Sequence, residues 1–118
     1  MVLRVTNDSI DGTLGTAVMS IEEFCVIRNH PFIASSHFDS VVVDLDERIP
    51  AGYLKHLVGT TKLIPKLIGP ITTHTIRMLS EIYPEYAPRL RHTFLLNRAG
   101  ISSLISEIAG TYRWDKFY

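Results

Sequence analysis

The side chains best suited to chemistry follow the predicted strands of this chain. Asp8 comes shortly after the apolar run 2–5, and Asp44 and Asp46 end or follow the β-branched run 40–45. In an open parallel sheet, ligands bind beyond the carboxyl ends of the strands. Carboxylates gathered there could share one divalent cation such as Mg²⁺, with Asp8 and Asp46 as the candidate ligands. The same acids are also common starters of turns and helix caps, and both interpretations stay open.

Two further loops are predicted to reach the same edge of the sheet. One follows the run 63–68 and contains two threonines, and the other follows the run 92–96. A hydroxyl and an amide are neutral groups that can bind an anion or orient a carboxylate. We therefore predict one polar pocket made by Asn7, Asp8, Asp44, Asp46, Thr72, Thr73 and Asn97.

The sequence offers no pattern for catalysis by a nucleophile or a transition metal. The five histidines are too dispersed to give a metal-ligand spacing, and Cys25 lies in an apolar run, where a thiol behaves as a small buried hydrophobe. Glycine-rich phosphate loops, Ser-His-Asp patterns and zinc motifs are also missing from the sequence. We therefore predict a protein that is not an enzyme.

Composition sets the broad class of the protein. With 118 residues, 46% of them hydrophobic, the chain can bury a core without a metal or disulfide. Its 12 basic and 12 acidic residues cancel, which leaves no global field to hold nucleic acid or an anionic membrane. A single cysteine fits a reducing compartment, and the chain has neither an apolar leader nor an 18-residue apolar run. We expect a cytoplasmic protein without direct nucleic-acid or membrane binding.

The hydrophobic pattern alternates between strand-like and helix-like segments. The unbroken run 40–45 predicts a central strand buried on both faces. The alternation indicates an α/β domain with a doubly wound, mostly parallel five-stranded sheet and flanking helices. We assign residues 1–110 to this domain and 111–118 to a tail or the start of a linker. The predicted strands are 2–5, 25–28, 40–45, 63–68 and 92–96, and the predicted helices are 11–24, a short one within 29–37, 53–58, 72–83 and 101–108.

The segment Val42-Val43-Asp44-Leu45-Asp46, with Pro50 after it, resembles the receiver domain of bacterial response regulators. In that family a phosphoaccepting aspartate ends the third strand, and a proline follows four residues later. The resemblance implies a flavodoxin-like fold, a role in two-component signalling and transcription regulation, and Asp46 as the residue at the phosphoacceptor position.

The departures from the receiver pattern imply a degenerate pocket. In this register Asn7 replaces one metal-binding acid, while Asp8 keeps the other. Asn97 takes the place of the lysine that contacts the acyl phosphate, and Arg98 replaces the usual proline. Without an ammonium group to neutralise the phosphoryl charge, phosphorylation would be slow or its signal lost. The chain thus resembles an atypical receiver, or pseudo-receiver.

Receivers dock dimers and output domains on the face made by their fourth helix, fifth strand and fifth helix. The resemblance therefore implies a module that homodimerises or holds an output domain independently of phosphorylation. For Phe94 we favour a place in the core over one at this interface. The implied interface contains Met78, Tyr83, Tyr86, Phe94 and Arg98, with a charged rim of Arg77, Glu81, Glu85, Arg89 and Arg91.

Two other resemblances remain as alternatives. Tyr83-Pro84-Glu85, followed by Phe94-Leu95-Leu96-Asn97, resembles the YPE…IIN segment of Sec14-like (CRAL-TRIO) lipid-binding domains. The strand Val41-Val-Val-Asp-Leu45 resembles the supporting strand of STAS-like regulatory domains. The first alternative implies a lipid-binding fragment, and the second implies another small module for protein interaction.

Overall fold

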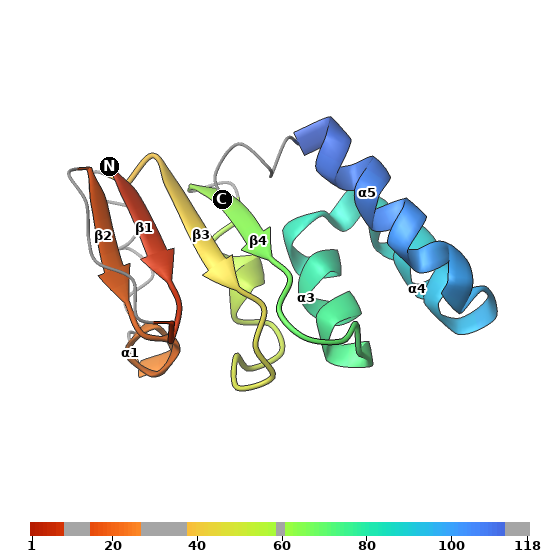
Figure 1. The fold of residues 1–118 in the computed structure, drawn as a ribbon, viewed down its shortest axis with the longest axis horizontal. Coiled ribbons are helices and arrows are strands. Elements are labelled where there is room, and N and C mark those ends of the chain that lie inside the picture. Colours follow the sequence, from red (N-terminus) through yellow and green to blue (C-terminus); the bar gives the residue numbers. More distant parts are fainter. Residues whose placement is uncertain (9–14, 27–37, 59–60, 113–118) are drawn as a thin grey trace.

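Four parallel strands form the sheet of this protein in the order β2-β1-β3-β4 (Figure 1). The computed structural model describes residues 1–8, 15–26, 38–58 and 61–112. The strands are β1 (Val2–Val5), β2 (Thr16–Met19), β3 (Ser40–Asp44) and β4 (Lys62–Lys66). The sheet and its neighbouring helices confirm the predicted α/β class.

The predicted central strand is confirmed. β3 pairs with β1 on one side and β4 on the other, and all five of its residues are buried. A run of Val41, Val42 and Val43 suits this position because β-branched side chains pack well against both faces of a pleated sheet.

The predicted helix 11–24 is wrong for residues 16–19 and confirmed for residues 21–24. Residues 16–19 form strand β2, paired in parallel with β1, and helix α1 is limited to Ile21–Val26. Gly15 has a φ of 85°, a left-handed conformation that glycine adopts without steric cost at the entry to β2. The hydrogen bonds between β2 and β1 outweigh the helical spacing of the apolar residues in this segment.

Two neighbouring predictions also need correction. The predicted strand 25–28 is wrong for Cys25 and Val26, which end α1, while residues 27–28 and the predicted helix within 29–37 lie outside the described residues. The predicted helix 53–58 is reduced to the 3₁₀ turn η1 (Leu54–His56). Pro65 lies inside β4, which is an edge strand of the sheet. An edge strand tolerates proline because its missing N–H costs no hydrogen bond to a neighbouring strand.

The predicted fifth strand 92–96 is wrong, because these residues belong to helix α4 (Ala87–Leu96). Pro88 occupies the first turn of α4, where the missing N–H has no intrahelical partner to lose. Leu90 and Phe94, four residues apart, are the buried residues of this helix. Turns η2 (Pro84–Tyr86) and η3 (Arg98–Gly100) flank it. The described part of the chain therefore has a sheet of four strands, not five.

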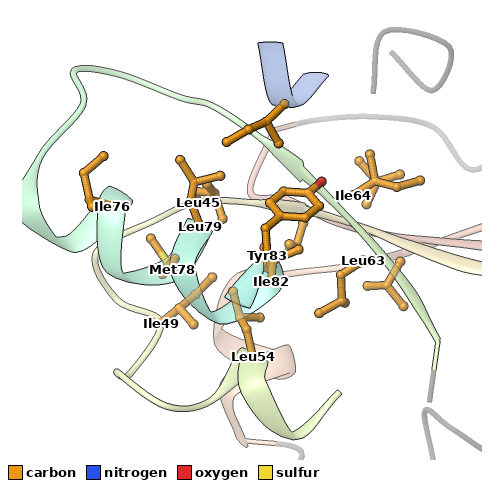
Figure 2. Packing of buried hydrophobic residues seen from close by; sticks show 14 of the residues in the cluster. Leu45, Ile49, Leu54, Leu63, Ile64, Ile76, Met78, Leu79, Ile82 and Tyr83 are labelled. Carbon is orange, nitrogen blue, oxygen red and sulfur yellow. The ribbon is translucent and has the colours of Figure 1, made fainter. Parts of the chain in front are cut away.

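Helix α3 (Thr73–Ile82) connects the sheet to the remaining helices. It packs against α4, which in turn packs against α5 (Ile101–Tyr112). Helix α5 confirms the helix predicted for residues 101–108. Figure 1 shows these three helices grouped beside β4, with α1 near β1 and β2 at the other end. Figure 2 shows side chains from β4, the loop after β3, η1 and α3 converging on one apolar core.

The start of α3 is fixed by a capping box. The Thr72 hydroxyl accepts a hydrogen bond from the Thr75 backbone N–H at 3.3 Å, and the Thr75 hydroxyl accepts one from the Thr72 N–H at 3.1 Å. These two bonds satisfy amides that a helix leaves without partners at its N-terminus. Because α3 joins the sheet to α4, its first turn positions everything that follows.

We expect Thr72→Ala to lower the free energy of unfolding by about 1 kcal/mol, because it removes the cap that accepts from Thr75. Urea unfolding followed by circular dichroism measures this change. Thr73→Ala is the matched control, since Thr73 is exposed and takes no part in the capping box. Equal effects of the two substitutions would contradict the assigned role of Thr72.

Candidate functional site

The carboxyl edge of the sheet holds a buried polar cluster around Asp44. Asp44 is 2% exposed and lies beside Thr6, which continues β1 in the same register. The Thr6 hydroxyl donates a hydrogen bond of 2.5 Å to one Asp44 oxygen, Oδ2. Arg4 Nη2 lies 3.9 Å from the other oxygen, Oδ1, to which no described group donates a hydrogen bond.

This arrangement gives Asp44 a structural role. A carboxylate removed from water must be compensated by hydrogen bonds or a cation, and Thr6 and Arg4 supply both from the neighbouring strand. The cluster therefore ties β1 to β3 across the sheet. Its burial leaves Asp44 too enclosed to meet an external ligand without a rearrangement of the edge.

Asp46, which the receiver resemblance would place at the phosphoacceptor position, is bound by Arg48. The Arg48 backbone N–H and its Nε both donate to Asp46 Oδ1 at 2.9 Å, and Nη2 donates to Oδ2 at 3.0 Å. These bonds lower the pKa of Asp46 below its ordinary value, with the Arg48 side-chain hydrogen bonds as the main cause. Arg48 also lies 3.6 Å from Glu22 of α1, so the carboxylate belongs to a network within the chain.

Asn7 and Asp8 bind other parts of the chain and do not line the cavity that contains Asp46. The Asn7 side-chain oxygen accepts from the Ile21 N–H at the start of α1, over 3.1 Å. The Asp8 N–H donates to the Thr6 hydroxyl, and the Asp8 carboxylate is exposed. Among the described residues, no group of three or more histidine, cysteine, aspartate or glutamate side chains could hold a metal ion.

A small cavity of about 320 Å³ lies at this edge and brings two of the predicted pocket residues together. Asp46 and Thr72 both line it, whereas Thr73 faces a different cavity and Asn97 follows α4, where it is exposed. The predicted seven-residue pocket is thus divided among separate places. The full lining is Leu45, Asp46, Glu47, Arg48, Ile68, Pro70, Thr72 and Thr75.

The larger cavity lies between helices and was not predicted. It measures about 750 Å³ and runs between η1, α3 and α4, and we name it the α3–α4 groove. Apolar and charged side chains alternate along its walls. The lining residues are Lys55, Val58, Thr73, Ile76, Arg77, Ser80, Glu81, Pro84, Ala87, Arg91, Phe94 and Leu95.

Three cations of the α3–α4 groove have no counter-ion within the described part of the chain. Lys55, Arg77 and Arg91 are exposed, and none forms a salt bridge with a described residue. Glu81 is the acid of the groove, and its Oε1 accepts a hydrogen bond from the Gly52 N–H. Its Oε2 is buried and has no hydrogen-bond partner among the described residues, a state that costs about 1–3 kcal/mol per group.

The predicted interface residues divide between core and surface. Met78, Tyr83 and Phe94 are buried, so they support the face from inside, and Tyr86 is half-buried. Arg98 is exposed and lies over the Phe94 ring, 4.4 Å from its centroid, in a cation–π contact.

Two features of the sequence indicated helix α4 and the groove beside it, but residues 92–96 were interpreted as a strand. Leu95 and Leu96, placed in a predicted strand, are 76% and 74% exposed on α4. Pro88 in a first turn, followed by buried Leu90 and Phe94 at helical spacing, was the signal for α4. Arg77, Glu81 and Arg91 were identified as a rim, but only the helix brings them around a cavity.

Cys25 and His74 make contacts that maintain structure. The Cys25 thiol lies 3.8 Å from the Arg48 carbonyl, and its pKa is raised, chiefly by burial, which disfavours the nucleophilic thiolate. His74 Nε2 donates to the Ile49 carbonyl at 2.7 Å, which links α3 to the loop after β3. Neither side chain is arranged as a catalytic group.

No protein-family model, curated protein or solved structure matches the chain. Among the described helices, none has the length and apolar character needed to cross a membrane. The geometry and charges of the two cavities therefore indicate what the chain can bind.

We expect the Asp46–Arg48 contact to stabilise the fold at neutral pH and not in acid. A carboxyl whose folded pKa is lowered stabilises the protein above the unfolded value of about 3.9, and this contribution is lost as the pH falls through the folded value. Asp46→Asn should therefore cost up to about 1 kcal/mol at pH 7. The difference from the native chain should close below pH of about 4.

Urea unfolding of both chains across this pH range measures the effect. Glu47→Gln is the control, because Glu47 is an exposed neighbour that forms no ion pair with the described residues. A cost for Asp46→Asn that stays constant from pH 7 to pH 3 would contradict the role of the carboxylate charge.

Proposed function

We propose that this chain is a non-catalytic regulatory domain that binds a protein partner in the α3–α4 groove, independently of phosphorylation. The observation that carries the proposal is the groove itself. Its volume of about 750 Å³ falls within the range of about 300–1,000 Å³ typical of ligand sites. It also combines apolar walls with cations that have no counter-ion among the described residues.

Binding at this groove would use two neighbouring surface features. Leu95 is largely exposed although it lines an apolar cavity, and Arg91 lies one turn before it on α4. A partner that covers the groove would remove the apolar surface from water and pair the cation at the same time. Aromatic, arginine and apolar side chains of this kind dominate the energetics of protein interfaces.

The carboxyl edge supports independence from phosphorylation. Both Asp46 oxygens accept hydrogen bonds from Arg48, so a phosphoryl group would first have to displace that side chain. Asn97, which stands where receivers carry a lysine, follows α4 and does not line the Asp46 cavity. The strand order β2-β1-β3-β4 agrees with the first four strands of a flavodoxin-like sheet and supports a receiver-like ancestry for the module.

The charge on α4 favours a different protein over a second copy of this chain. A twofold dimer through α4 would bring Arg91 and the groove cations of both copies toward each other. Like charges placed opposite each other oppose association. We therefore replace the homodimer expected from the receiver resemblance with a hetero-complex at this face.

A Sec14-like lipid-binding role is the second candidate, and one observation favours it. Pro84, in the segment that resembles those domains, lines the α3–α4 groove, whose apolar walls and cations would also suit an anionic lipid. A titration with a fatty acid such as oleate separates this candidate from protein binding.

We expect no phosphoryl transfer to Asp46. After incubation with a small phosphodonor such as acetyl phosphate and Mg²⁺, intact-mass spectrometry should find the unmodified mass. The reason is that the Arg48 contacts occupy both carboxylate oxygens. An adduct of one phosphate that disappears in Asp46→Asn would instead make this a working receiver.

We expect the groove to bind 1-anilinonaphthalene-8-sulfonate, a small probe that is both apolar and anionic. Leu95→Ser should weaken binding several-fold, because it removes apolar surface from the groove wall. Leu96→Ser should leave binding unchanged, since Leu96 is equally exposed but does not line the groove. A fluorescence titration of the folded protein measures both affinities.

Circular dichroism of each variant shows that the fold is retained. Failure of the native chain to bind the probe, or equal losses in the two leucine variants, would overturn the groove as the binding site.

A further inference from the structure

Three exposed cations of this neutral chain line one cavity. The formal net charge is zero, yet the exposed cations Lys55, Arg77 and Arg91 line the α3–α4 groove with a single acid, Glu81. Other acids lie elsewhere: Glu22 with Arg48, Asp39 with the N-terminal amine, and Asp46 in the small cavity at the sheet edge. The groove therefore favours an occupant that carries negative charge at its margins.

Glu81 adds a more specific requirement. One of its oxygens is held by the Gly52 N–H, and the other is buried without a described partner. An occupant whose donor reaches this oxygen after a small movement of the Glu81 side chain would satisfy the acceptor. Hydroxyl, amide and indole groups of a peptide can donate such a bond, whereas an alkyl chain cannot.

The shape of the groove is set by two helices. Thr73, Ile76 and Ser80 recur three or four residues apart along α3, so the lining follows one face of that helix, and Pro84 of η2 extends it. A ten-residue helix is about 15 Å long, which matches about three turns of a helix lying beside it. Ala87, Arg91 and Leu95 recur at the same interval on α4 and form the opposite wall.

We propose that the occupant of the α3–α4 groove is an acidic amphipathic helix of a partner protein. This inference rests on the proposed function and names its partner class. The apolar stripe of the helix packs on Ile76, Phe94 and Leu95, and its flanking carboxylates pair with Arg77 and Arg91. A donor side chain within the stripe meets Glu81. Helix-in-groove binding of this kind presents anchors at i, i+3 or i+4, and i+7.

The test is an unbiased selection of peptides that bind the full chain. A random library of 16-residue peptides is selected on the immobilised protein, and affinities of the selected peptides are measured by fluorescence anisotropy. We expect peptides with net negative charge, apolar residues at helical spacing and affinity that falls as salt rises. Circular dichroism should show that they gain helix when bound.

Two arginines of α4 provide the matched variants. Arg91→Glu should weaken the selected peptides by about tenfold or more, because it replaces an attractive charge with a repulsive one. Arg89→Glu should change affinity less than about twofold, because Arg89 lies outside the groove and makes an exposed pair with Glu107. Lys55→Glu, on a different element, repeats the test should Arg91→Glu fail to fold.

The outcomes separate this inference from the proposed function. Selection of basic or extended peptides, of none at all, or of peptides insensitive to Arg91→Glu would overturn the acidic helix. If the anionic probe still binds through Leu95, the groove remains a binding site for another occupant. Displacement of the selected peptides by oleate at lower concentration than by acidic peptide would assign the groove to an anionic lipid and overturn the peptide.

Discussion

The burial of β3 on both faces is the constraint on which the rest of this structure depends. Because both faces of β3 are covered, its side chains should be apolar, and Val41, Val42 and Val43 meet this requirement. Asp44 ends the same strand and is equally buried, so its charge must be met from within the protein. Thr6 and Arg4, on the adjacent strand, are placed by the β1–β3 register to meet it.

Asp44 and Asp46 at the sheet edge bind other groups of the same chain, so this edge is less suited to an external ligand than the α3–α4 groove. In open parallel sheets the loops after the strands usually carry the ligand. Here Asp44 serves the β1–β3 contact, Asn7 binds the start of α1, and Asp46 binds Arg48. Each of these polar groups already has a structural partner, whereas the cations of the α3–α4 groove have none among the described residues. Cations without a counter-ion among the described residues and exposed apolar side chains thus occur together at the α3–α4 groove.

The sequence predicted elements best where one physical effect dominated. β3 follows from an unbroken β-branched run, and α3 follows from a capping threonine before apolar residues at helical spacing. Predictions failed where a short apolar run suited two structures. Residues 16–19 and 92–96 exchanged roles: the first pairs its amides with β1, and the second buries Leu90 and Phe94 from a helix that begins around Pro88. Pairing and packing with distant residues decided both cases, and a local pattern does not contain them.

The same limit explains why the candidate site was only partly foreseen. The residue types of the groove were visible as a charged rim, but charge along a sequence does not say which cations share a cavity. That depends on α4 being a helix, because a helix brings Arg91 and Leu95 within one turn of each other, whereas an extended strand would separate them by about twice that distance. Helix α4, in place of the predicted fifth strand, therefore forms one wall of the groove. It also places Asn97 after α4 and outside the lining of the small cavity that contains Asp46. The same difference in secondary structure thus accounts both for the groove and for the division of the predicted pocket.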